Sequence, residues 1–144
     1  MRIADILTAK GADVVSVRPD CAVAELLTLL AEHGIGAAVV SSDGAAVHGI
    51  GSERDVVRAL AQRGAAVLQE PVLRICTVEV HTVEPDARFE DLMRIMTEQR
   101  IRHVPVVAGG VLKGIVSIGD VVKRRITELE DERAALTAYI STGG

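Results

Sequence analysis

The sequence predicts a mixed α/β (α+β) fold made of two copies of a β-α-β-β-α unit, the second extended by a long C-terminal helix. The first observation is an internal repeat, since residues 49–57 recur as residues 114–122 with six of nine positions identical. Upstream, residues 17–41 match residues 83–107 with seven identities. The second observation is that the hydrophobic pattern within each copy changes between strand and helix periods. A repeat of this length indicates two units that bury their apolar faces together.

The first unit, residues 1–62, contains one complete set of elements. Apolar and β-branched runs bounded by turn residues predict its strands, and apolar residues at helical spacing predict its helices. In order, these are a strand at 14–17, a helix at 22–33, strands at 37–41 and 47–51, and a helix at 52–62. Pro19 ends the first strand, and Gly34 is placed to cap the first helix.

The second unit, residues 72–144, repeats this order after a connector at 63–71 that Gly64 and Pro71 punctuate. Its predicted elements are a strand at 78–83, a helix at 87–99, strands at 103–107 and 111–116, and a helix at 118–140. The segments that lead into the two units, residues 3–8 and 72–77, also resemble each other.

Composition excludes several classes of function. With only Phe89 and Tyr139 as aromatic residues, the chain has few stacking platforms for single-stranded nucleic acid, and its net charge of −4 disfavours phosphate backbones. No apolar run reaches membrane-spanning length and the N-terminus has no signal-peptide pattern, so we expect a cytoplasmic protein without membrane contact. Cys21 and Cys76 are expected to be reduced thiols, and the histidines show no metal-ligand spacing.

These features resemble a pair of CBS (cystathionine-β-synthase) domains, the two-repeat unit called a Bateman module, as a small stand-alone protein. The resemblance is carried by two G-I-x-S-x-x-D-V-V strings, two V-x-P-D helix starts, and R-I-R-H-V-P-V-V at 100–107. It implies two units packed through their sheets about a pseudo-two-fold axis, with two clefts that bind adenosine-containing ligands in this family. It also implies a regulatory role, and pairs of this family commonly dimerise.

The two Ser-x-x-Asp strings are the candidate ribose-binding residues. They comprise Ser52 with Asp55 and Ser117 with Asp120, each where a strand becomes a helix. A carboxylate there can accept hydrogen bonds from both hydroxyls of a ribose diol. The alternative is a capping box, with Ser at the N-cap and an acidic residue three positions later. The two interpretations are compatible, since Ser can cap while Asp faces the cleft.

The resemblance also implies phosphate-binding residues at the junction between helix and strand, where Arg102 and His103 lie. Arg54 and Lys123 are lesser phosphate candidates. The matching first-unit positions are Gly36 and Ala37, which carry no charge, so we expect unequal clefts. One cleft is expected to combine Ser117, Asp120, Arg102 and His103 with an adenine pocket of Ile35, Gly36, Ala37 and Ile115. The other is expected to combine Ser52 and Asp55 with Ile50, Ile101 and Thr77.

The last helix is longer than the repeat requires. Its apolar residues recur at spacings of four, three, seven and four, and Arg133 fills the skipped position; they are Val122, Ile126, Leu129, Leu136 and Ile140. Such spacing indicates a seam with another helix, and we expect a homodimer. The alternative is that the stripe packs back onto its own domain.

The sequence therefore predicts a sensor of adenine nucleotides that acts on an unidentified regulated protein. AMP is the expected ligand because one cleft has few cations for a triphosphate, while ADP, ATP and NAD(H) stay open. A ligand-free scaffold or interaction module is the main alternative. An enzyme is not expected, because no nucleophile–base pair and no phosphate-binding glycine loop can be found. No metal is expected.

Overall fold

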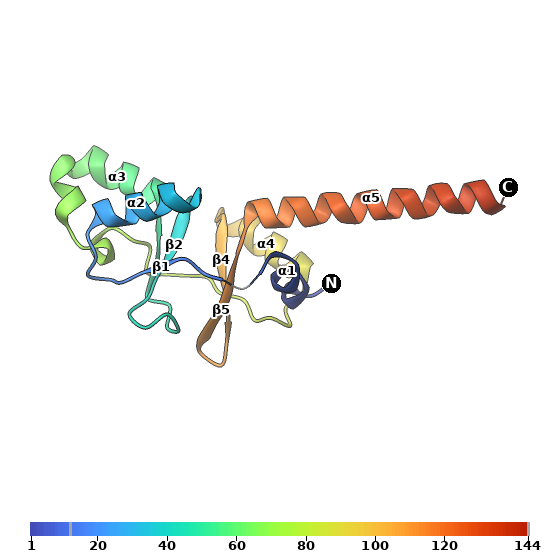
Figure 1. Cartoon of the computed structure of the whole chain (residues 1–144), viewed down its shortest axis with the longest axis horizontal. Helices are drawn as coiled ribbons and strands as arrows, with labels where there is room; N and C mark the ends of the chain where they lie inside the picture. Colours follow the sequence, from blue (N-terminus) through green and yellow to red (C-terminus); the bar gives the residue numbers. More distant parts are fainter. Residues whose placement is uncertain (12, 144) are drawn as a thin grey trace.

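The first repeat forms a three-stranded sheet and two helices in the computed structural model, which describes residues 1–11 and 13–143 (Figure 1). The elements are β1 (Ser16–Val17), α2 (Val23–His33), β2 (Ala37–Val40), β3 (Gly49–Ser52) and α3 (Glu53–Arg63). β1 pairs with β2 in parallel, and β2 pairs with β3 antiparallel. The predicted β-α-β-β-α order of this unit is confirmed, although β1 is shorter than expected.

The second repeat has an antiparallel two-stranded sheet. Its elements are α4 (Phe89–Gln99), β4 (His103–Ala108), β5 (Val111–Ser117) and α5 (Ile118–Gly143). The predicted strand at 78–83 is wrong, because only Val83 forms a bridge, in parallel with Val106. The β-branched pattern of this stretch does not pack onto the sheet: Val78 is 60% exposed, and residues 79–81 line a cleft instead.

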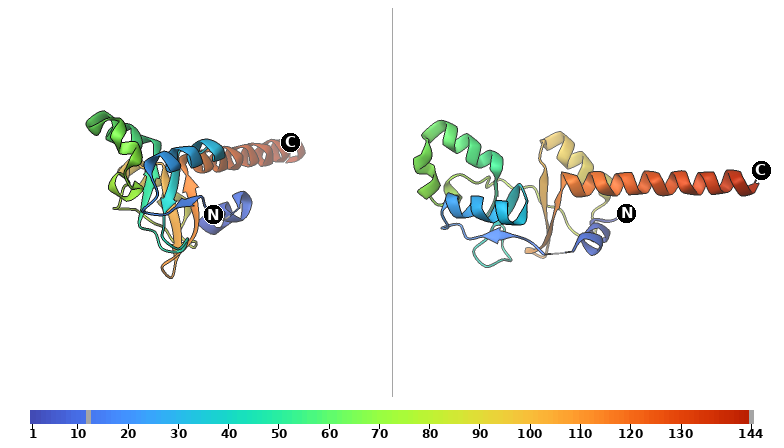
Figure 2. Two further views of the ribbon diagram at one scale, coloured as in Figure 1. Left: turned by 60° about the vertical axis from the view of Figure 1, so that its left-hand side comes forward. Right: turned by 45° about the horizontal axis from the view of Figure 1, so that its top comes forward.

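The segments that lead into the repeats are exchanged between two aliphatic cores. α1 (Ile3–Lys10) comes first in the chain, yet its Ile3 is buried in the core of the second repeat with Phe89. Conversely, the 3₁₀ helix η2 (Val72–Arg74) opens the second repeat but buries Val72 in the core of the first. A further 3₁₀ helix, η1 (Ala65–Gln69), lies in the connector. Figures 1 and 2 show α1, in dark blue, beside the start of α5.

Backbone hydrogen bonds fix this exchange in the same way on both sides. The Ile3 amide donates to the Ala87 carbonyl at 2.9 Å, and the Val72 amide donates to the Cys21 carbonyl at 2.8 Å. Ala87 and Cys21 occupy equivalent positions in the two repeats. The matched bonds express the pseudo-two-fold relation between the units, and each sequence repeat therefore completes its core with a segment of the other.

α5 projects away from both sheets (Figure 1). Val121 is the one buried residue among its described positions. Its apolar stripe is between 48% and 73% exposed; the residues concerned are Val122, Ile126, Leu129, Leu136, Tyr139 and Ile140. The alternative in which this stripe packs onto its own domain is therefore wrong.

No helix in the part of the chain that the structure describes combines the length and apolar character that crossing a bilayer requires. The expected cytoplasmic location stays a prediction.

The exchange predicts that a residue of the first lead-in stabilises the second core. Ile3→Ala should lower the free energy of unfolding by about 2–5 kcal/mol, because a fully buried side chain leaves a cavity. Urea denaturation followed by circular dichroism measures this. Val57→Ala is the control, since Val57 is 64% exposed and its loss should change stability by about 0.5 kcal/mol or less. Equal small losses for both variants would contradict the packing of α1.

Candidate functional site

Both Ser-x-x-Asp strings form capping boxes where a strand meets a helix. The Asp55 amide donates to Ser52 Oγ at 3.2 Å, and the Ser52 amide donates to Asp55 Oδ2 at 3.0 Å. The same two bonds join Ser117 and Asp120 at 3.2 and 2.9 Å. The capping interpretation is thus confirmed in both repeats. Each carboxylate also lines a cleft between the repeats, so a carboxylate that caps a helix can still contact a ligand in the cleft.

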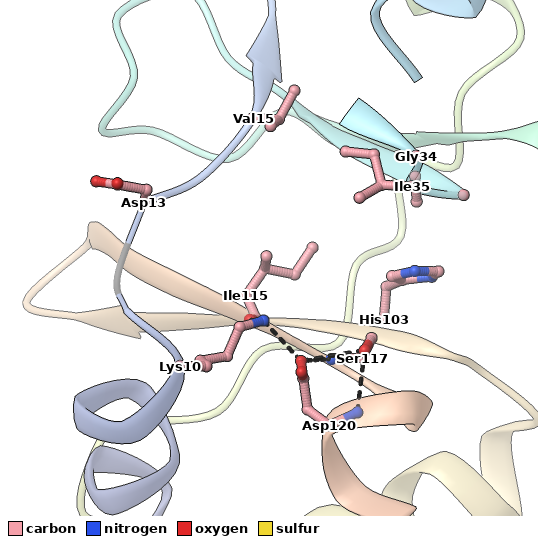
Figure 3. A pocket seen from close by; sticks show the side chains of 11 residues that line it. Lys10, Asp13, Val15, Gly34, Ile35, His103, Ile115, Ser117 and Asp120 are labelled. Carbon is pink, nitrogen blue, oxygen red and sulfur yellow. Dashed lines mark hydrogen bonds and ion pairs between the residues drawn. The ribbon is translucent and has the colours of Figure 1, made fainter. Parts of the chain in front are cut away.

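The first cleft, of about 380 Å³, contains Asp120 (Figure 3). It brings together most of the residues that the sequence grouped with this carboxylate: Ser117, His103, Ile115, Ile35, Gly36 and Ala37. The floor comes from β5 and the start of α5, and the opposite wall comes from the first repeat. The residues expected to border an adenine in this cleft therefore come from both repeats.

Lys10 is a residue of this cleft that the sequence did not indicate. Its Nζ lies 2.6 Å from Asp120 Oδ2 and donates to the Ile115 carbonyl at 2.8 Å (Figure 3). The two side chains are partly exposed, at 30% and 23%. Lys10 ends α1 and reaches Asp120 only because α1 packs against the second repeat, so no local sequence signal could have found it.

The ion pair sets the protonation state of Asp120. Burial by itself would raise the pKa of this carboxyl, but hydrogen bonds from Lys10 and Ser117 outweigh burial and lower it. Asp120 is consequently an anion at neutral pH, with one oxygen already holding three donors. Oδ1 has no hydrogen bond among the described residues.

The second cleft, of about 620 Å³, contains Asp55. Its lining includes the other residues grouped with this carboxylate, namely Ser52, Ile50, Ile101 and Thr77, and also Arg54. Asp55 Oδ2 accepts from the Ser52 hydroxyl at 2.9 Å, and Oδ1 lies 3.3 Å from the Thr77 hydroxyl.

Arg102 belongs to this second cleft, and its expected placement beside Asp120 is wrong. The Arg102 carbonyl accepts from the Ile118 amide at 2.8 Å, which ties its backbone to the helix start of its own repeat. Its side chain lines the cleft on the other side. Ile101 and Arg102 thus lie in the cleft of the opposite repeat's carboxylate, whereas Gly36 and His103 line both clefts.

The charges of the two clefts differ. The Asp55 cleft is lined by four arginines and three carboxylates; they are Arg54, Arg58, Arg100 and Arg102 with Glu53, Asp55 and Glu79. The Asp120 cleft is lined by one lysine and two carboxylates, which are Lys10, Asp13 and Asp120. Lys123 lines neither cleft. Cationic side chains suited to phosphate therefore gather in the Asp55 cleft.

Arg100, which lines this cleft, is held in an unfavourable backbone conformation. It caps α4 with φ of +54°, and it is the one non-glycine residue with positive φ among those described. The equivalent cap of α2 is Gly34, with φ of +61°. A left-handed conformation costs a non-glycine residue about 1–2 kcal/mol, and such strain gathers at functional sites. An alignment of the two repeats would have revealed that Arg100 stands at the position where the first repeat has Gly34.

His103 lines both clefts and lies close to Gly36. Burial lowers the pKa of this imidazole, and the nearby Asp120 carboxylate opposes that effect only in part. The neutral ring therefore predominates at pH 7 in the ligand-free protein. The described residues hold no group of three or more side chains suited to a metal ion.

The chain belongs to the CBS-domain family. The family model for the CBS domain matches residues 3–62 and 72–126, one match for each repeat. The architecture thus defines a CBS-domain pair, the class that the sequence repeat indicated.

Particular relatives span nearly the whole chain. The mitochondrial CBS domain-containing protein CBSX3 of Arabidopsis thaliana is 34% identical over 98% of this chain and 72% of its own length. A crystal structure of a CBS-domain protein of Agrobacterium tumefaciens is 46% identical with a TM-score of 0.83, covering 87% of this chain and 99% of that one. A Pyrobaculum aerophilum CBS domain protein, crystallised with AMP, is 31% identical with a TM-score of 0.74, covering 83% and 89%.

The pKa of His103 predicts a pH dependence of stability. Because folding lowers this pKa below its unfolded value of about 6.5, the folded protein should lose stability as pH falls from about 6.5 toward the folded pKa. Urea denaturation at several pH values measures this slope. His103→Gln should flatten it, whereas His33→Gln, at an exposed position, should not. Identical slopes for wild type and His103→Gln would contradict the assignment.

Proposed function

We propose that this CBS-domain pair is a regulatory module that binds AMP-like adenine nucleotides in the clefts between its repeats. The AMP complex of the Pyrobaculum aerophilum relative supports an adenosine-type ligand. ADP, ATP and NAD(H) contain the same adenosine monophosphate portion and are the alternative ligands.

The observation that carries the proposal is the composition of the Asp55 cleft. Asp55, the carboxylate proposed to bind ribose, shares one cavity with four arginines, so a single ligand could contact both. Asp55 would accept from the ribose diol, and Ile50, Ile101 and Thr77 would border the adenine. Arg102, Arg54 and Arg100 would hold phosphate through charge-assisted contacts. A nucleotide carries base, ribose and phosphate on one molecule and could use all of these residues together.

We propose that the Asp120 cleft binds the adenosine portion of a ligand and holds its phosphate less strongly than the Asp55 cleft does. Lys10 already neutralises the carboxylate, and Asp13 adds a negative charge to the lining. A ribose would use the remaining oxygen of Asp120 or displace Lys10. Gly36, Ala37 and Ile115 would border the adenine. We therefore expect the Asp120 cleft to bind AMP and adenosine with similar affinity.

The capping boxes favour one rival, a ligand-free scaffold in which Asp55 and Asp120 only cap helices. A thermal-shift screen separates the two functions. A ligand that binds only the folded protein stabilises it by about 2.7 kcal/mol at one hundred times its dissociation constant. Stabilisation by AMP supports the sensor, and the absence of a shift with every adenine nucleotide supports the scaffold.

Arg102→Ala should weaken AMP binding far more than adenosine binding, because adenosine has no phosphate to lose. Removing one charge-assisted contact should cost about 2 kcal/mol, or roughly 30-fold in affinity for AMP. Isothermal titration calorimetry with both ligands measures this. Arg94→Ala on α4 removes an exposed arginine outside both clefts and should leave both affinities unchanged. Equal losses for AMP and adenosine would show that Arg102 does not bind phosphate.

Arg100→Gly should raise stability and weaken AMP binding at once. Glycine relieves the left-handed strain but adds unfolded-state entropy, so the net gain should be up to about 1 kcal/mol. Arg100→Ala is the matched control, since it removes the guanidinium and keeps a Cβ in the strained conformation. It should weaken AMP equally without gaining stability. If neither variant changes AMP affinity, the strain serves no nucleotide contact.

We further propose that the protein is a homodimer joined through the stripe on α5. Leu129→Asp places a charge in the middle of the stripe and should convert the dimer to a 15.2 kDa monomer. The variant should fold normally, because Leu129 is 48% exposed in the single chain. Light scattering at micromolar concentration measures the mass. A wild-type protein that is already monomeric there would rule the dimer out.

A further inference from the structure

Lys10 makes two hydrogen bonds in the Asp120 cleft that a bound nucleoside could make in its place. Its Nζ donates to Asp120 Oδ2 at 2.6 Å and to the Ile115 carbonyl at 2.8 Å (Figure 3). A ribose hydroxyl is likewise a donor toward a carboxylate, and an adenine amino group is likewise a donor toward a carbonyl. The ammonium therefore already serves both acceptors in the ligand-free protein.

The Asp55 cleft has no equivalent ammonium. Each carboxylate receives a backbone amide and a hydroxyl from its own capping serine, so the two caps match. Extending the alignment of the two lead-in segments by two residues places Glu79 at the position of Lys10, and Glu79 lines the Asp55 cleft. Among the residues that the structure describes, no basic side chain forms an ion pair with Asp55. Lys10 is thus an addition to the Asp120 side of the repeat.

We propose that Lys10 competes with ribose for Asp120, so that the Asp120 cleft fills only at higher nucleoside concentrations than the Asp55 cleft. This inference rests on the proposed function and adds the residue that separates the affinities of the two clefts. The module then responds to its ligand in two concentration ranges, one for each carboxylate.

α1 holds Lys10 in place for this competition. Leu7 is buried in the core of the second repeat, and the Gly11 amide donates to the Leu7 carbonyl at 2.8 Å, which closes the end of the helix. Leu7 also lies tightly against β5, since a Cβ at Gly114 would be 2.6 Å from Leu7 Cδ2. Because the Lys10 backbone is fixed, pairing with Asp120 orders only side-chain torsions, which limits its entropic cost. A ribose can displace the ammonium by rotating this side chain, with α1 left in position.

Removing the ammonium should favour the ligand, because Asp120 would lose its charged partner. Lys10 and Ser117 together lower the pKa of this carboxyl against the effect of burial. Without Lys10, Ser117 still donates to the carboxylate, and a ribose diol becomes the replacement for the missing donor. The ligand then gains its contact with Asp120 without first breaking an ion pair.

Methyl NMR can measure each cleft separately, because Ile115 lines the Asp120 cleft and Ile50 lines the Asp55 cleft. Adenosine is the probe, since it has no phosphate for the arginines to hold. Lys10→Met should tighten adenosine binding at the Ile115 methyl roughly tenfold and leave binding at the Ile50 methyl unchanged. Lys10→Arg keeps a cation beside the carboxylate and should retain the wild-type affinity at both methyls.

A nucleoside without the diol tests the cause of the tightening. 2′,3′-Dideoxyadenosine keeps the base and lacks both ribose hydroxyls, so Lys10→Met should leave its affinity nearly unchanged. Lys10→Gln is a second variant, which should tighten adenosine less than Lys10→Met does because its amide is a neutral donor. Circular dichroism verifies that each variant is folded. Equal tightening of both nucleosides would show that the variant merely enlarges the cleft, and weaker adenosine binding would show that Lys10 holds the ligand; either result overturns the competition.

The same titrations separate this inference from the proposed function. If AMP shifts the Ile50 methyl while adenosine binds at Ile115 equally well in wild type, Lys10→Met and Lys10→Gln, the sensor stands and the competition is overturned. If neither methyl responds to adenosine or to any adenine nucleotide in wild type and variants alike, the sensor and the competition fail together.

Discussion

The exchange of lead-in segments between the two repeats is the constraint on which the other features depend. Ile3 completes the core of the second repeat and Val72 completes that of the first, so neither sequence unit buries its apolar face alone. Matched backbone hydrogen bonds hold both crossings. Because the chain crosses twice, the helix starts at Ser52 and Ser117 are held against the opposite repeat. The clefts are therefore a product of the exchange, and each is lined by both repeats.

The same architecture produces two chemically different sites from one repeated unit. Asp55 and Asp120 make equivalent capping contacts, and the difference comes from the residues that the opposite repeat presents to each carboxylate. The first repeat presents Gly36 to Asp120, whereas the second presents Arg102 to the Asp55 cleft. At the caps of α2 and α4, glycine is likewise replaced by a strained Arg100. The second repeat has arginines where the first has glycines, and these arginines supply the cations proposed to hold a phosphate.

Local patterns predicted the order of elements and both capping boxes, because these depend on residues a few positions apart. Most of the cleft groupings came instead from the resemblance to CBS-domain pairs, because they join residues of different repeats. The strand at 78–83 failed because β-branched alternation does not reveal whether a sheet edge is available, and only Val83 finds one. Lys10 could not be predicted, because its approach to Asp120 depends on where α1 packs. The sequence analysis placed Arg102 with Asp120 of its own repeat, which is wrong, and placed the neighbouring Ile101 with Asp55 of the other repeat, which is correct. Only the three-dimensional crossing shows that both residues of this junction face the Asp55 cleft.

A crystal structure of the protein with AMP would test the central claim most directly, because the two clefts offer the phosphate opposite electrostatic environments. We expect the ribose on Asp55 and the phosphate among Arg54, Arg100 and Arg102, with the ion pair between Lys10 and Asp120 preserved. AMP bound only in the Asp120 cleft, with its phosphate on Lys10 and His103, would contradict the assignment of the phosphate-binding cleft.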